Sequence, residues 1–359
     1  MRYVKILAML IGSFLVIQAT SSAKPPVQGD YLMMEFSDST ESNAPFASLS
    51  NLTMDGVGNG TFQQIFLSNG DTPESGSFTY KLSPDGSFAI MVGEDTFYGV
   101  AGPEGQGLVV INTSSTSPGF YSAIKKSSNM SNSSVSGDYI LASYGDEISS
   151  NDPWSCLASL HMDGNGNGTY QQLENSKNDP LESGSFTYSV GSDGVIYINA
   201  GGNTFQGLVS GDSSYMCLTR ITGTSQDVEI MLAIKKSSGL SNASLKGEYI
   251  MADFTDSSSS NSPVSTLTVL RMDGSGNGTY RNLRSSNTDP LESGSFTYSV
   301  TSDGSLTIIV NGEPLHGIAA ASGNVLIISE TSSDNPGIVL AIKKSAGAMT
   351  WLPLLLDDQ

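Results

Sequence analysis

The chain has 359 residues, a formal net charge of −19 and only 14% charged residues. Nucleic-acid binding needs a basic surface that displaces counterions from phosphates, so this balance argues against a nucleic-acid partner. The 39 glycines and the many Ser, Thr and Asn residues are typical of strands joined by tight turns rather than of helices.

Residues 1–23 have the pattern of a secretory signal peptide. Arg2 and Lys5 precede an apolar run over residues 6–19, and the small residues 21–23 suit a signal peptidase. The run is too short to span a bilayer, and no later stretch is long enough to do so. We therefore expect a secreted or periplasmic protein without a transmembrane segment.

One domain-sized sequence then occurs three times. Gly-Asp-Tyr or Gly-Glu-Tyr begins at residues 29, 137 and 247, and each copy continues through Met-Asp-Gly-x-Gly-Asn-Gly-Thr and Glu-Ser-Gly-Ser-Phe-Thr-Tyr to Ala-Ile-Lys-Lys-Ser. A period near 110 residues is too long for a solenoid or propeller repeat and indicates separate modules. We place modules at 27–126, 135–236 and 245–345, linkers at 127–134 and 237–244, and a C-terminal tail at 346–359.

The second module shows the strand pattern most clearly. In residues 184–190, Phe186, Tyr188 and Val190 alternate with small polar residues, and this period of two indicates a strand with one buried face. Asn-Gly, Asp-Gly and Gly-Asn pairs between such runs favour hairpin turns. The predicted strands are residues 139–144, 156–162, 169–173, 184–190, 195–199, 204–209, 215–221 and 229–234.

Eight sequential antiparallel strands can close on themselves and leave no free edge. We therefore predict an all-β protein of three tandem eight-stranded antiparallel up-and-down barrels, with β-sandwiches as the alternative. The Ser- and Asn-rich linkers are expected to be flexible, so that the barrels resemble beads on a string.

The opening Gly-x-Tyr and the basic residue on the last strand resemble the lipocalin and streptavidin type of barrel, the calycin-like group. The closing residues would be the lysines at 125, 235 and 343 or their neighbours at 126, 236 and 344. The chain also resembles tandem exported β-barrel repeats of bacteria. The first resemblance implies a barrel that carries a small ligand inside.

Six aromatic residues are expected to point into the barrels: Phe78, Tyr80, Phe186, Tyr188, Phe296 and Tyr298. An eight-stranded barrel is just wide enough to be filled by side chains or to hold one small molecule. Either these rings fill the interior, or they line a cavity for an apolar ligand.

The loop that begins at Asp163 has the oxygen spacing of a calcium loop, with Asn165, Asn167 and Glu174 at positions 3, 5 and 12. The other modules have Phe66 and Arg284 where the second has Glu174. Because residues 169–173 read as a strand, the alternative is a plain hairpin turn.

Cys156 and Cys217 both lie in the second module. They either form a disulfide or remain two buried free thiols, and the sequence does not decide between these alternatives. His161 and His316 stand without a paired nucleophile, so we do not expect an enzyme. The first hypothesis is an exported structural or interaction module, with an unidentified protein partner. The alternatives are a carrier with an apolar ligand in each barrel and a calcium-stabilised surface protein.

Overall fold

The structure is a computed structural model that describes residues 27–223 and 227–344. The predicted signal peptide (1–23) and the C-terminal tail (346–359) lie outside the described residues. Within them, no helix is long and apolar enough to cross a membrane. The described residues include three short 3₁₀ helices: η1 (Pro103–Gly105), η2 (Asn132–Val135) and η3 (Asn242–Leu245).

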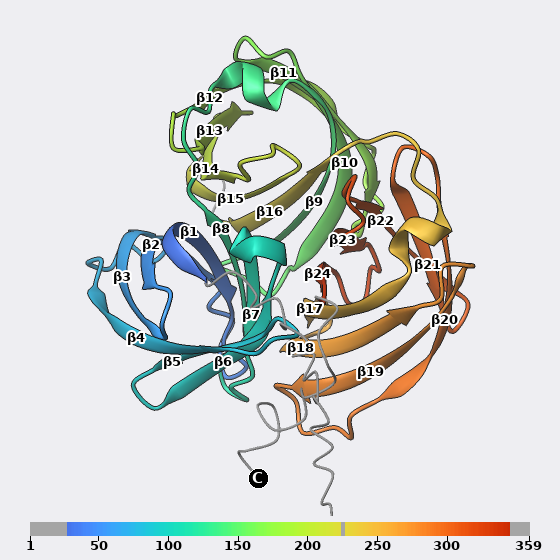
Figure 1. Cartoon of the computed structure of the whole chain (residues 1–359), viewed down its shortest axis with the longest axis horizontal. Helices are drawn as coiled ribbons and strands as arrows, with labels where there is room; N and C mark the ends of the chain where they lie inside the picture. The colour runs from blue at the N-terminus through green and yellow to red at the C-terminus, as the bar shows by residue number, and fades with distance from the viewer. Residues whose placement is uncertain (1–26, 224–226, 345–359) are drawn as a thin grey trace, which may run out of the picture.

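Three closed eight-stranded antiparallel barrels form the molecule, which confirms the predicted fold class and removes the sandwich alternative (Figure 1). Barrel 1 contains β1 (Gln28–Ser37), β2 (Phe46–Asp55), β3 (Asn59–Leu67), β4 (Ser75–Leu82), β5 (Ser87–Val92), β6 (Asp95–Ala101), β7 (Gly107–Asn112) and β8 (Gly119–Lys125). Barrel 2 contains β9 (Gly137–Glu147), β10 (Trp154–Met162), β11 (Asn167–Asn175), β12 (Ser183–Val190), β13 (Val195–Ala200), β14 (Asn203–Val209), β15 (Tyr215–Thr222) and β16 (Asp227–Lys235). Barrel 3 contains β17 (Gly247–Ser257), β18 (Ser260–Met272), β19 (Asn277–Ser285), β20 (Ser293–Val300), β21 (Ser305–Val310), β22 (Glu313–Ala319), β23 (Val325–Glu330) and β24 (Gly337–Lys343).

Strands on the outer side of each barrel follow the predicted alternation. In β12, Phe186 and Tyr188 are buried while Ser185 and Thr187 are exposed. Each barrel closes where its first strand pairs with its last; in barrel 1, for example, Met34 of β1 lies opposite Ser122 of β8. The alternating residues thus build one apolar interior per barrel.

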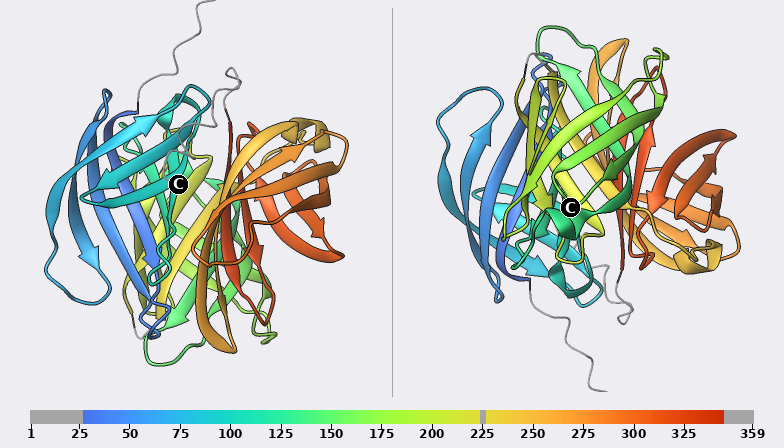
Figure 2. Two further views of the ribbon diagram at one scale, coloured as in Figure 1. Left: turned by 90° about the horizontal axis from the view of Figure 1, so that it is seen from below. Right: turned by 90° about the horizontal axis from the view of Figure 1, so that it is seen from above.

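Strands that face the neighbouring barrels do not alternate. Every residue of β9 from Tyr139 to Asp146 is buried, because one face lines the barrel and the other packs against the other two barrels. A single apolar cluster collects outward-facing residues from all three barrels. The barrels therefore surround a common central core. Figure 2 shows the three barrels from two further directions.

Three aromatic rings meet in this core, one from each barrel. Phe36, Tyr144 and Phe254 are fully or almost fully buried and contact one another edge to face, with centroid distances of 5.1, 5.1 and 5.5 Å. Edge-to-face pairs add about 0.5–1.5 kcal/mol each beyond the area they bury. This aromatic triad marks the axis about which the barrels are arranged.

The linkers differ from the expectation of flexible tethers. Residues 127–134 and 237–244 run into η2 and η3, whose Val135 and Leu245 are fully buried in the interiors of barrels 2 and 3. Asn132 Oδ1 accepts the N–H of Val190 at 2.8 Å, and Asn242 Oδ1 accepts that of Val300 at 2.8 Å. Each linker therefore seals one end of the barrel that follows it.

Lysines at the ends of the last strands join each barrel to the next. Lys126 pairs with Asp193 at 3.7 Å and Lys236 with Asp303 at 3.1 Å, and both pairs are partly exposed. Lys344 pairs with Asp85 at 2.9 Å and closes the ring from barrel 3 to barrel 1, with both side chains buried. The preceding lysines of barrels 2 and 3, Lys235 and Lys343, lie 5.7 and 5.5 Å from the rings of the opening tyrosines.

Two further contacts between barrels use equivalent positions with different chemistry. Glu174 of barrel 2 binds His316 of barrel 3, and its second oxygen accepts a hydrogen bond from Thr331 at 3.2 Å. At the next interface, Arg284 of barrel 3 lies 3.7 Å from the ring centroid of Tyr98 in barrel 1. Because the partners differ from one interface to the next, each barrel fits its own neighbours.

Candidate functional site

The six predicted aromatic residues do lie inside the barrels, with exposed fractions of 4–6%. Each Phe ring covers a glycine of the neighbouring strand; a Cβ at Gly168, for instance, would lie 2.2 Å from the ring of Phe186. Each Tyr hydroxyl accepts the N–H of a hairpin glycine, as Tyr188 does from Gly164 at 2.8 Å. At this end of the barrels the rings fill the interior.

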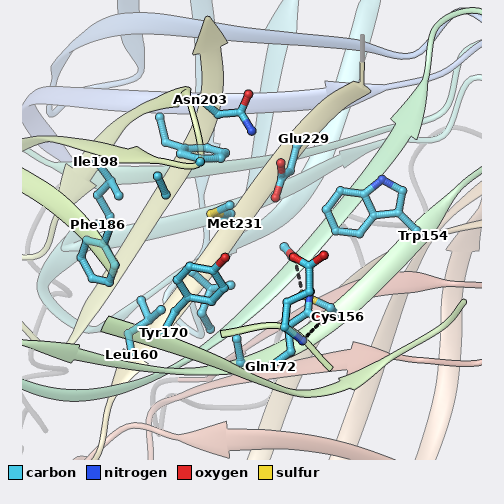
Figure 3. Close-up of a pocket in the computed structure, with 17 residues that line it drawn as sticks. Trp154, Cys156, Leu160, Tyr170, Gln172, Phe186, Ile198, Asn203, Glu229 and Met231 are labelled. Carbon is cyan, nitrogen blue, oxygen red and sulfur yellow. Dashed lines mark hydrogen bonds between the residues drawn. The ribbon is translucent and has the colours of Figure 1, made fainter. Parts of the chain in front are cut away.

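The interior of barrel 2 contains a cavity of about 330 Å³ (Figure 3). Its lining is mostly apolar: Leu141, Ala158, Leu160, Phe186, Ile198, Ala200, Phe205 and Met231, with Trp154 and Tyr170 as amphipathic rings. Polar groups also face it, from Ser143, Cys156, Gln172, Glu182, Asn203 and Glu229. Of the six predicted aromatic residues, Phe186 alone belongs to this lining.

Three strand positions explain why barrel 2 is hollow. In barrel 1, Glu35 of β1 lies opposite Ser48 of β2 and Tyr121 of β8. Ser48 and Tyr121 donate hydrogen bonds to the two oxygens of Glu35 at 2.6 and 2.9 Å, and Phe97 packs on the Tyr121 ring at a centroid distance of 5.1 Å. These side chains occupy the interior of barrel 1.

The same register in barrel 2 places smaller side chains. Ser143 of β9 lies opposite Cys156 of β10 and Met231 of β16, where barrel 1 has Glu, Ser and Tyr. Ser143 Oγ and the Cys156 sulfur form a hydrogen bond of 3.0 Å where barrel 1 has the carboxylate network. The volume that Glu35 and Tyr121 fill in barrel 1 is left as the cavity in barrel 2.

Trp154 lies at the edge of the cavity because Gly145 stands opposite it on β9. A Cβ on Gly145 would lie 2.7 Å from the indole ring, so a larger residue would displace it. Barrel 1 has the pair Ser37 and Phe46 at these positions. The cavity shares Trp154, Cys156, Gln172 and Glu182 with an adjoining surface hollow of about 420 Å³.

The charges around this hollow are mainly negative. Its lining includes Glu147, Asp152, Asp179, Glu182 and Asp227, with Lys177 paired to Asp152. Such a rim raises the local concentration of cations and repels anions.

At the wall of the cavity, Glu229 binds the guanidinium of Arg220, and both side chains are buried. Burial raises the pKa of Glu229 above its usual value, and the neighbouring Arg220 opposes part of this shift. Two buried N–H groups of Arg220, at Nε and Nη1, have no hydrogen-bond acceptor. The cavity therefore has one strongly polar side in an apolar interior.

The predicted calcium loop is not assembled as a metal site. Asp163 Oδ1 accepts the N–H groups of Asn165 and Asn167 at 2.7 and 2.9 Å, and its Oδ2 accepts the Asn167 amide at 3.1 Å. These hydrogen bonds lower the pKa of Asp163. Glu174 lies six residues farther along β11 than Gly168, which is about 20 Å for an extended strand, and it binds His316 instead. The loop is a hairpin turn that its Asp stabilises.

Cys156 and Cys217 are free thiols, on β10 and β15, which are not neighbouring strands. Burial raises the pKa of each thiol to about 12, so both are protonated. His161 pairs with the exposed Asp138 at 2.7 Å.

Sequence reasoning missed Trp154, the Arg220–Glu229 pair and the small residues that open the cavity. The available signal was the inward position that is Glu35 in the first module and Asp253 in the third but Ser143 in the second. That these three residues occupy equivalent inward positions can be recognised only when the strand register is known.

No family model matches the sequence, and no curated protein matches it. Similar solved structures include a point mutant of transferrin-binding protein B from Haemophilus parasuis, with 9% identity, 89% of this chain and 76% of that chain covered, and a TM-score of 0.32. The corresponding protein from Neisseria meningitidis serogroup B has 8% identity, coverage of 89% and 77%, and a TM-score of 0.29. A DUF3598-family protein of unknown function from Nostoc punctiforme has 7% identity, coverage of 88% and 95%, and a TM-score of 0.21. Likenesses this low carry no argument about function.

Proposed function

We propose that the protein is an exported, non-catalytic binding protein whose second barrel takes one small ligand, while barrels 1 and 3 support it. The cavity in barrel 2 is the observation that carries this proposal. Its volume lies near the lower end of the range for small-molecule sites, and a mainly apolar lining with a few polar groups is the usual composition of such sites. The proposal modifies the carrier hypothesis from a ligand in every barrel to a ligand in one.

The lining favours a ligand with an apolar or aromatic body and a neutral or cationic polar end. Phe186, Phe205 and Tyr170 offer ring surfaces, whereas Glu229 and Asn203 offer hydrogen-bond partners. The acidic rim disfavours anions, because a negative ligand would have to pass several carboxylates. Export is supported by the signal-like sequence of residues 1–23.

A fluorescent probe tests the cavity directly. N-phenyl-1-naphthylamine is neutral and apolar, and it is expected to bind one per chain with an increase in emission. The anionic 8-anilinonaphthalene-1-sulfonate is expected to bind more weakly because the rim repels it. Native mass spectrometry of protein purified from its own host should show a single small molecule bound.

The filled interior of barrel 1 supplies the matched variants. Ser143→Glu, Cys156→Ser and Met231→Tyr together place the Glu35, Ser48 and Tyr121 network in barrel 2, and this variant should bind the probe at least tenfold more weakly. The reverse pair in barrel 1, Glu35→Ser with Tyr121→Met, should create a second probe site. Unchanged binding by the first variant, with its fold intact by circular dichroism, would refute the proposal.

A further inference from the structure

Three aspartates, one from each barrel, meet at the axis of the molecule. Asp38, Asp146 and Asp256 lie two residues beyond the aromatic triad, where the first strand of each barrel ends. Their exposed fractions are 2%, 0% and 1%, and one carboxylate oxygen of each lies within 4.8 Å of the others. Three buried carboxylates therefore converge on one point between the barrels.

Each aspartate accepts the same two backbone hydrogen bonds through Oδ1, and its Oδ2 accepts none. Oδ1 of Asp38 accepts the N–H groups of Ser39 and Ala44 at 2.7 and 2.8 Å. Asp146 and Asp256 accept the equivalent N–H groups, one and six residues farther along, at 2.7–3.0 Å. Oδ2 of all three is buried without a hydrogen-bond partner. Buried polar atoms in native proteins are almost always paired, so the unpaired oxygen on each of these three clustered carboxylates needs a partner.

Three asparagines form a second ring among the same turns. The side-chain amides of Asn43, Asn151 and Asn261 donate to the backbone oxygens of Glu147, Ser257 and Ser39, at 2.7, 2.8 and 2.6 Å. Each acceptor directly follows the aspartate of the neighbouring barrel. The Oδ1 atoms of these asparagines are also buried without hydrogen-bond partners.

Nothing among the described side chains neutralises the three carboxylates. No Lys, Arg or His of residues 27–223 and 227–344 forms an ion pair with them. Burial raises the pKa of Asp38 to about 6 and those of Asp146 and Asp256 to about 7, and neighbouring carboxylates add a smaller part for Asp146 and Asp256, so burying the three groups as carboxylates carries a cost. A bound cation would remove that cost.

We propose that one Ca²⁺ ion binds between Asp38, Asp146 and Asp256 and fastens the three barrels together. The donors are all oxygens, which suits a hard cation rather than zinc. Calcium binds oxygen at about 2.3–2.6 Å, so an ion centred among three oxygens suits separations of about 4.0–4.5 Å, within the 4.8 Å limit that these carboxylates meet. Mg²⁺, at about 2.0–2.1 Å, would require the same oxygens to lie about 3.5 Å apart and in near-octahedral geometry. The two positive charges of the ion offset most of the three negative charges.

The test counts calcium ions bound to the full chain. Protein stripped with EDTA and moved into chelator-free buffer is dialysed against Ca²⁺, and the bound metal is measured by atomic emission. We expect one ion per chain and a melting temperature that rises with Ca²⁺, since a ligand that binds only the folded state stabilises it. Asp146→Asn should weaken binding at least tenfold, whereas Asp163→Asn in the hairpin turn should leave it unchanged.

Other counts would overturn the proposal. No bound ion and no thermal shift would mean that the carboxylates hold protons only, and three ions per chain would point to the three hairpin turns. Asp146→Asn keeps an oxygen for the two backbone N–H groups and removes one charge, so without Ca²⁺ it should melt above the unmodified protein. A loss of the Ca²⁺ response together with that higher melting temperature separates lost binding from misfolding.

Discussion

The barrel interiors and the central core are both apolar, but the chain builds them differently. In β12 every second residue is buried, which is sufficient to fill one barrel. In β9 the buried residues are consecutive, because the strand belongs to barrel 2 on one face and to the shared core on the other. The difference indicates that each module can close alone but is left with an apolar outer face that only its two neighbours cover.

The largest effect is expected when one module is expressed without the two neighbours that cover its apolar outer face. A chain of residues 127–236, which keeps the segment that seals barrel 2, would expose Ile230, Leu232 and Tyr144, which the central core buries. An apolar patch of this kind drives association, so we expect oligomers or aggregates by size-exclusion chromatography with light scattering. The same chain with Ile230→Lys and Leu232→Glu should be largely monomeric. A stable monomer without these changes would show that the modules are independent.

A pair of phenylalanine variants separates the two cores within the full chain. Phe36→Ala and Phe78→Ala both remove a buried ring from barrel 1 and should each lower the free energy of unfolding by about 3–5 kcal/mol. Because Phe36 contacts Tyr144 and Phe254, its loss should speed hydrogen exchange in all three barrels. Phe78→Ala should affect barrel 1 alone. Exchange that rises only in barrel 1 for both variants would contradict a shared core.

The ion pairs between barrels should contribute differently to the free energy of unfolding, according to how deeply they are buried. Lys344→Met removes the ion pairs of Lys344 with Asp85 and with Glu248 of barrel 3, and it leaves Asp85 buried without a cation, which typically costs about 3 kcal/mol or more. Lys126→Met removes a partly exposed pair, for which about 0–1 kcal/mol is typical. Urea unfolding of both variants measures how much each substitution lowers the free energy of unfolding. Equal losses of stability would contradict a larger contribution from the buried pair between barrels 3 and 1.

The smallest expected effect concerns pH and the interior of barrel 3. Burial, and then the charge of Glu330, raises the pKa of Asp253 well above its usual value, and its Oδ1 has no hydrogen-bond partner. A raised carboxyl pKa stabilises the fold below the unfolded value near 4 and loses that contribution as pH rises toward the folded value. Asp253→Asn should therefore gain melting temperature relative to the unmodified chain between pH 4 and pH 8.

The barrels could be predicted because the information is local. Alternation in residues 184–190 and the Gly-Asn turns specify strands and hairpins without reference to the rest of the chain. The cavity depends on Ser143, Cys156 and Met231, which meet only through strand pairing, so its volume could not be read from their spacing. Asp38, Asp146 and Asp256 are more than 100 residues apart, and the packing of whole barrels brings them together.

The linkers were misjudged for a related reason. Composition rich in Ser and Asn favours flexible chain, but it equally suits short capped turns. Ser131 and Ser134 form a capping box at η2, and Ser241 and Ser244 repeat it at η3. What composition could not reveal is that Val135 and Leu245 would each meet an open barrel end.

The three barrels form a ring within a single polypeptide. In a ring of three separate identical subunits, any substitution would appear in every copy at once, and hollowing one barrel would hollow them all. Here a change such as Glu to Ser at one inward position alters one barrel and leaves the side chains of the other two unchanged. Because the three barrels belong to one chain, the interior of barrel 2 can lose packing while barrel 1 keeps the side chains that fill it.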